Sequence, residues 1–168
     1  IIFTNQIKLT LNTLKGLTVH FWNVYGIEHD PEKSHVITDF IRKGFEEGEF
    51  EMMTDGTEER QFLYAEDCCE ALETVMESYT DFKPEDPLHI TSFRGSTIKE
   101  VAEIIQGQFN LIGKYDVKIK PGLAKDSVQM DKRNEANNYI LGWWTPKTNL
   151  QDGIAKVFTA MRKEYESN

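Results

Sequence analysis

The chain has 168 residues, of which 39% are hydrophobic and 28% charged, as in a globular protein that builds one good core, or one domain plus part of a second. It carries 28 Asp and Glu against 19 Lys and Arg, a net charge of −9, which disfavours nucleic-acid binding. No apolar stretch approaches the ~20 residues of a membrane span. The two cysteines, Cys68 and Cys69, are adjacent and cannot easily pair, which predicts a reducing, cytoplasmic location.

Apolar residues recur at helical or strand spacing along most of the chain. In chain order we expect a helix at 4–15, a strand at 17–22, a polar loop at 27–35, a helix at 36–47, short strands at 50–53 and 61–65, a helix at 66–79, a strand at 88–91, a helix from 98, a strand at 115–120 and a last helix opening at 148. This alternation of strands and helices predicts an α/β protein. No Gly-x-x-Gly-x-x-Gly occurs, so a complete dinucleotide-binding fold is not encoded.

Two of the predicted helices carry start signals. Thr97 with Glu100, and Thr148 with Gln151, have the spacing of a capping box, in which two side chains satisfy free backbone N–H groups at a helix start. We therefore expect helices to open at these two threonines.

Asn23 follows the predicted strand 17–22, at the sheet edge where open α/β proteins bind ligands. Its amide can donate to a phosphate and accept from a backbone N–H. The alternative is a plain turn, because Asn and a following Gly, here Gly26, are common turn residues after a strand.

Arg60 follows a turn at residues 55–56 and precedes a predicted strand. A guanidinium there can make a two-pronged contact with a phosphate, although pairing with the neighbouring Glu58 or Glu59 is the commoner fate of such a residue. Lys120 lies in a basic segment, which the residues alone explain as lysines that protect an exposed strand edge.

A metal site is not expected. The loop that holds His29, Asp30, Glu32 and His35 matches no known ligand spacing and is better explained as a charged, solvated loop. No Gly-x-Ser-x-Gly pattern or Cys/His nucleophile pattern appears either.

Two segments together resemble a signature of the extended short-chain dehydrogenase/reductase family, the NAD(P)-dependent epimerases and dehydratases of nucleotide sugars. The first is Asn-Val-Tyr-Gly at 23–26, and the second is Asp-Gly-Thr-Glu-Glu-Arg-Gln-Phe-Leu-Tyr-Ala-Glu-Asp at 55–67. The family writes them as Arg-x-x-Asn-Val-Tyr-Gly-Pro and Asp-Gly-x-x-x-Arg-Asp-Phe-x-Tyr-Val-x-Asp. His20 stands at the position of the family's Arg, and Gln61 at that of an Asp.

The resemblance implies an α/β fold that comprises a C-terminal substrate-binding subdomain plus the last strands and helices of a Rossmann-type sheet. In the family both segments belong to the C-terminal half, so we expect residues 1–168 to be a C-terminal fragment without the N-terminal cofactor-binding part. The catalytic Tyr-x-x-x-Lys of the family lies on the helix before the Asn23 strand. Residues 1–15 contain no such pair, so no catalytic residue is expected in this chain.

The resemblance also assigns site residues. Lys33, in Pro-Glu-Lys at 31–33, resembles a segment of the dTDP-glucose dehydratase branch near the diphosphate, and Lys120 takes the Arg place of Arg-Pro-Gly-Asp. The substrate-binding residues that it implies are Asn23, Lys33, Val36, Arg60 and Lys120. The cofactor-binding residues that it implies are His20, Phe21 and Trp22.

The function that follows by resemblance is the substrate-binding part of a nucleotide-sugar epimerase or dehydratase, which works by hydride transfer on a sugar ring. NAD or NADP would serve the complete enzyme, and this chain alone would bind no cofactor and be inactive. The partners would be a nucleotide-diphosphate sugar and a second copy of the chain, packed through the apolar face of Ile7, Leu11 and Leu14. The alternative is a non-catalytic nucleotide-sugar-binding or protein-interaction module on the same scaffold.

Overall fold

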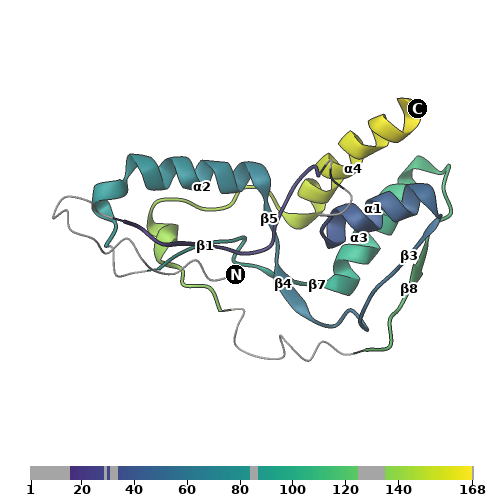
Figure 1. Ribbon diagram of the computed structural model, residues 1–168, viewed down its shortest axis with the longest axis horizontal. Coiled ribbons are helices and arrows are strands. Elements are labelled where there is room, and N and C mark those ends of the chain that lie inside the picture. Colours follow the sequence, from purple (N-terminus) through teal and green to yellow (C-terminus); the bar gives the residue numbers. More distant parts are fainter. Residues whose placement is uncertain (1–15, 29, 31–33, 84–86, 125–134, 168) are drawn as a thin grey trace.

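The computed structural model describes residues 16–28, 30, 34–83, 87–124 and 135–167. The predicted helix at 4–15 and Lys33 lie outside these residues. Figure 1 shows an elongated molecule with helix α2 and strand β1 toward one end and helices α1, α3 and α4 with strands β3 and β8 toward the other.

Four helices form where apolar residues recur at helical spacing. They are α1 (Val36–Glu46), α2 (Ala65–Glu77), α3 (Ile98–Ile112) and α4 (Leu150–Ser167), with short 3-10 turns at Tyr79–Asp81 (η2) and Tyr139–Gly142 (η3). The predicted start of α3 is confirmed, because the Glu100 N–H donates to the Thr97 hydroxyl over 3.0 Å. That helix ends at Gly113, whose φ of 69° suits a residue without a Cβ.

The predicted capping box at Thr148 is wrong. Helix α4 begins at Leu150, and the Asn149 side chain caps it by accepting from the Asp152 N–H over 2.9 Å. Thr148 lies one position before this cap, and its hydroxyl donates to Asp67 instead.

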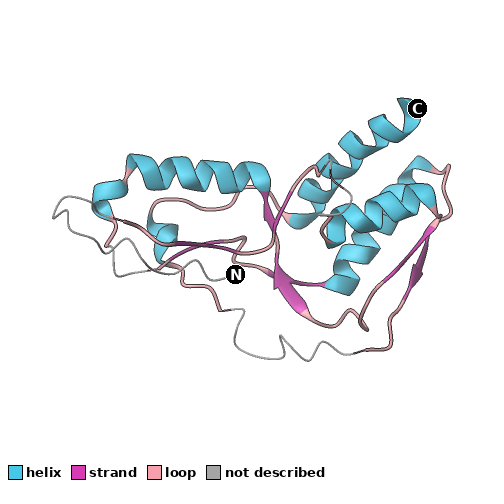
Figure 2. Cartoon of the chain, in the orientation of Figure 1, coloured by secondary structure: helices cyan, strands magenta, loops and turns pink. Residues whose placement is uncertain are grey.

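The strands are short and pair two by two in the described part of the chain (Figure 2). Their bounds are β1 Val19–Phe21, β2 Val24–Tyr25, β3 Glu49–Glu51, β4 Glu59–Gln61, β5 Leu63–Tyr64, β6 Leu88–Ile90, β7 Gly95–Thr97 and β8 Lys118–Lys120. The pairs β1–β6, β2–β5 and β3–β8 are parallel, and β4–β7 is antiparallel. The fold is therefore mixed α/β with small sheets, and the predicted strand at 61–65 is divided between β4, β5 and the start of α2.

The buried side chains form two hydrophobic clusters. The first core cluster joins α1, α3 and α4 to β3 through residues such as Ile41, Phe109 and Ile154. The second core cluster joins α2 to β6 and η3 through residues such as Leu88 and Ile140. The chain passes between the clusters at 24–25, 62–65, 91–98 and 144–150, so the segments that could position a site cross between them.

Candidate functional site

Asn23 lies at one of these crossings, between β1 and β2. Its φ of 35° is in the left-handed region, which Asn tolerates better than most residues. Its amide Nδ2 donates to the Gln61 carbonyl over 3.2 Å, and the Leu63 N–H donates to the Asn23 carbonyl over 3.2 Å. Asn23 therefore joins the end of β1 to the β4–β5 segment. Its positive φ fits the turn interpretation, while a contact of its amide with a phosphate stays a prediction.

A buried polar pair fixes the next segment. Gln61 is 9% exposed and Thr91 is fully buried, and the Thr91 hydroxyl donates to Gln61 Oε1 over 3.0 Å. Because a buried amide oxygen needs a donor, this contact holds β4 against the loop that follows β6.

Arg60 lies next to Gln61 on β4, so the structure brings it close to Asn23. It is half-buried, and its Nη1 donates to the Glu59 carbonyl over 2.8 Å. In the β4–β7 register it lies opposite Ser96, so the two side chains share one face of the ribbon.

Lys120 lies elsewhere, on the β3–β8 pair. Its ammonium contacts the Glu49 carboxylate, and this hydrogen bond, together with the charges of Glu49, Glu51 and Glu47, raises the pKa of the lysine. Figure 1 shows β8 toward one end of the molecule and β4 near its middle. The structure thus joins the segments of Asn23 and Arg60 and leaves Lys120 paired on a separate ribbon, and the roles of all three residues in binding stay predictions.

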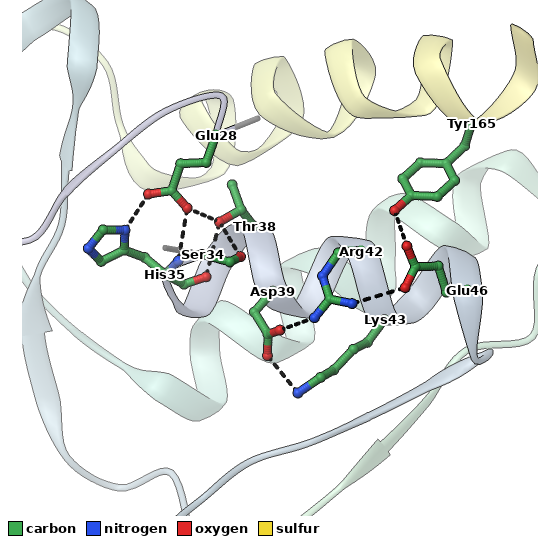
Figure 3. Close-up of polar contacts among 9 residues, drawn as sticks. All are labelled: Glu28, Ser34, His35, Thr38, Asp39, Arg42, Lys43, Glu46 and Tyr165. Carbon is green, nitrogen blue, oxygen red and sulfur yellow. Dashed lines mark hydrogen bonds and ion pairs between the residues drawn. The ribbon is translucent and has the colours of Figure 1, made fainter. Parts of the chain in front are cut away.

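Val36, another predicted substrate residue, opens helix α1 and packs against the first core cluster. A polar cluster around Glu28 holds this helix start (Figure 3): the carboxylate accepts from the His35 N–H over 2.8 Å and also contacts His35 Nδ1 and the Thr38 hydroxyl. Burial raises the pKa of Glu28, but the hydrogen bonds from Thr38 and His35 outweigh it and lower the pKa below its usual value.

Of the predicted cofactor residues, His20 on β1 and Trp22 just after it form an aromatic patch with His89, and Phe21 between them lies on the opposite face of the strand. His20 is exposed and stacks on His89, with ring centroids 5.0 Å apart and planes 16° apart, so it does not face the core. Phe21 is 52% exposed, and the half-buried Trp22 ring lies 5.5 Å from His89. Burial, and then the neighbouring His20, lower the pKa of His89, whose Nδ1 accepts from the Asn137 N–H.

A cavity of about 660 Å³ opens beside β4 and β7. Phe62 and Ile104 line its apolar side, and Ser96, the residue opposite Arg60, lines it as well. Its volume is in the range of small-molecule sites. Arg94 is exposed at this cavity, and its guanidinium has no hydrogen bond or ion pair with any residue that the structure describes.

Sequence reasoning missed Arg94. The available signal was its place in a polar loop directly after strand β6, the edge at which α/β proteins bind ligands, but a single arginine in a loop has no spacing that singles it out. The opposite wall of the cavity is formed by residues 146–152, which include the cap of α4.

One Tyr-x-x-x-Lys spacing does occur in the sequence, at Tyr79 and Lys83. It lies after α2, and Phe82 between them is extended, with φ −83° and ψ 143°. The two side chains therefore do not follow one another on a helix face, as a catalytic pair on a helix would. In the part of the chain that the structure describes, no helix is long and apolar enough to cross a membrane, and no three potential metal ligands gather.

Comparison with known proteins decides the family. Residues 9–90 match the model of the NAD dependent epimerase/dehydratase family. The chain belongs to this family. A putative GDP-L-fucose synthase 2 of Oryza sativa subsp. japonica is 30% identical over 145 residues, and the match covers 81% of the chain and 39% of that relative. A GDP-L-fucose synthase of Sinorhizobium fredii is 28% identical over 157 residues, or 87% of the chain and 46% of the relative.

Solved structures of epimerases share the fold. The UDP-glucose 4-epimerase of Thermotoga maritima, solved with UDP-glucose, matches with a TM-score of 0.68 at 22% identity, over 87% of this chain and 45% of that one. Epimerase Mth375 of Methanothermobacter thermautotrophicus matches with a TM-score of 0.72 at 16% identity, over 90% and 44%. The NAD-dependent epimerase/dehydratase chain described here therefore spans less than half the length of the curated relatives and solved structures above.

Proposed function

We propose that the chain is the substrate-binding part of a nucleotide-sugar epimerase or dehydratase, and that it holds the diphosphate beside β4 and β7. The observation that carries this proposal is the contact of Asn23 with the Gln61 carbonyl, which ties the Asn23 segment to the strand that carries Arg60 although 37 positions separate the two residues in sequence. Arg94 adds a second guanidinium at the adjoining cavity. Several donors around one site are what a diphosphate needs, because each charge-assisted hydrogen bond neutralises part of its charge.

The surroundings support a nucleotide sugar rather than a simple anion. Phe62 and Ile104 offer an apolar surface to a ring, and Ser92 and Ser96 offer hydroxyls. A solved relative by fold, the UDP-glucose 4-epimerase of Thermotoga maritima, carries UDP-glucose. Lys33, Val36 and Lys120 remain proposed members of the site, with Lys120 joining only if it leaves its glutamate partners.

The aromatic patch on β1 suits the nicotinamide end of NAD or NADP. His20 and Trp22 present ring surfaces on one face, against which a planar ring can lie, and Phe21 offers a half-exposed ring on the opposite face of the strand. NAD would supply hydride transfer when bound. The sequence has no glycine fingerprint for the pyrophosphate, so we expect ring contacts from this chain and no tight binding of the whole cofactor.

The 168-residue polypeptide by itself should show no turnover of UDP-, GDP- or dTDP-sugars with NAD. The physical reason is that its only Tyr-x-x-x-Lys spacing is not on one helix face and it has no pyrophosphate loop. Turnover above a buffer control would contradict this part of the proposal. We also propose that the chain forms a homodimer, which light scattering at several concentrations would test.

Binding of UDP, GDP and dTDP, followed by calorimetry, tests the diphosphate site. Arg60→Ala should weaken binding by about 1.5–3 kcal/mol, the value of a hydrogen bond to a charged group. Asn23→Gly, which keeps the positive φ and removes the amide, should weaken it as well. Arg162→Ala is the matched control, because Arg162 is an arginine on α4 paired with Glu166. Equal affinities for wild type and Arg60→Ala would refute the site.

A further inference from the structure

Asp67 is a buried carboxylate, 3% exposed, in the first turn of α2. Its Oδ2 accepts from two backbone N–H groups, Lys147 over 3.1 Å and Thr148 over 2.8 Å, and its Oδ1 accepts from the Thr148 hydroxyl over 3.2 Å. Both oxygens are therefore used by one short segment some 80 positions away in sequence. The helix N-terminus stabilises this buried negative charge.

The segment that Asp67 holds is also a wall of the cavity. Lys147 and Thr148 line it together with Arg94 and Ser96, and the same segment leads into the cap of α4. A second tie from the same helix, the 2.6 Å ion pair of Glu70 with Lys147, is exposed and screened by solvent, so it holds the segment more weakly. Among the contacts described, the hydrogen bonds to the buried Asp67 carboxylate thus hold this segment most strongly.

We propose that Asp67 is a positioning residue for the nucleotide-sugar cavity: it orders the wall at 146–149 before the ligand arrives. The inference rests on the proposed function, because it assigns to this wall a share in ligand affinity. If the wall is already ordered in the free protein, binding loses less conformational entropy, and the ligand binds more tightly. Asp67 is also the last residue of the sequence signature at 55–67. The binding contacts proposed above give this residue no role.

The test compares three variants with the wild-type chain. Asp67→Ala removes all three hydrogen bonds. Asp67→Asn is the conservative rescue, because its one carbonyl oxygen can still accept both N–H groups and its amide can donate to the Thr148 oxygen. Val75→Ala is the matched control: it truncates another buried residue of α2, in the second core cluster, and leaves the wall untouched. The measurements are the affinity for UDP and GDP, amide exchange at Lys147 and Thr148, and the melting temperature.

We expect Asp67→Ala to speed exchange at both amides and to weaken nucleotide binding roughly 5- to 20-fold, as the complex must now order the wall. Asp67→Asn should bind within about threefold of wild type. Val75→Ala should melt at a lower temperature with unchanged affinity. Unchanged affinity in folded Asp67→Ala, or an Asn variant as weak as the Ala variant, would overturn the proposal. If wild type binds no nucleotide, the proposed function fails, and unchanged amide exchange in Asp67→Ala would then refute the anchoring separately.

Discussion

Helices α1 and α3 cross at Gly44, where there is no room for a methyl group. A Cβ built on Gly44 would lie 2.4 Å from Phe109 Cε2 and 2.5 Å from its Cζ. The Phe109 ring cannot move aside, because it is fully buried and packs against Phe45 and Phe158, each with ring centroids 4.8 Å away. The Gly44→Ala substitution should therefore force the two helices apart.

Two opposing effects set the size of the change. Alanine stabilises a helix interior by about 0.8–1 kcal/mol relative to glycine. Overpacking of a tight core costs about 1–3 kcal/mol, and more where the neighbour is rigid, as the Phe109 ring is here. Carbon atoms at 2.4 Å are far inside the ~3.5–4.0 Å of a normal contact, so we place the cost at the upper end and expect a net loss of about 1–3 kcal/mol.

Gly107→Ala is the matched control. Gly107 lies inside α3 and has no atom within 4 Å of its built Cβ, so only the helix preference should act and the variant should gain about 0.5–1 kcal/mol. The assay is urea unfolding followed by circular dichroism at 25 °C for wild type and both variants. A Gly44→Ala chain as stable as wild type, or a loss of equal size in both variants, would refute the reasoning.

Two further predictions concern Tyr25 and Glu28. A Cβ on Gly153 would lie 1.9 Å from the Tyr25 hydroxyl oxygen, so Gly153→Ala should destabilise the fold. Tyr25→Phe removes this oxygen and should relieve part of the loss. A double-mutant cycle of unfolding free energies measures this coupling, and additive effects of the two substitutions would contradict the contact. The Tyr25 hydroxyl is buried without a partner among the described residues, so Tyr25→Phe alone should cost little or even stabilise. The pKa of Glu28 is lowered in the fold, so its stabilisation is complete above its unfolded pKa of about 4.3 and is lost as the pH falls through the folded value. Glu28→Gln should therefore destabilise at pH 7, and this loss should shrink as the pH falls below the unfolded pKa of about 4.3; a loss that does not change with pH would refute this.

Helices were predictable from the sequence because their signals are local. The apolar spacing from Val36 onward and the cap at Thr97 each act within one or two turns, and both elements formed where expected. The start of α4 was missed for the opposite reason. The Thr148 hydroxyl serves Asp67, 81 positions away, and no local pattern reveals such a partner.

The candidate site, like the helices, was predictable from the sequence only in part. Asn23 and Arg60 lie in a sequence signature, and the structure joins their segments through the Gln61 carbonyl. Lys120 lies on the separate β3–β8 ribbon, where it contacts Glu49, 71 positions away in sequence, and its role in binding stays a prediction. Arg94 and Asp67 acquire their surroundings only when the chain crosses between the two core clusters, so periodicity could not single them out.

Because the chain crosses repeatedly between its two cores, no single cut divides it into two self-sufficient pieces. A break after Gly113, for example, leaves Phe109 and Leu88 on one fragment, and Ile154 and Ile140, their companions in the first and second core clusters, on the other. Each fragment would expose its own members of both core clusters, which favours reassociation over independent folding. The repeated crossing thus makes the molecule suited to fragment complementation, in which two separate fragments reassemble. Binding of a ligand at the crossing segments would then report that the fragments have reassembled.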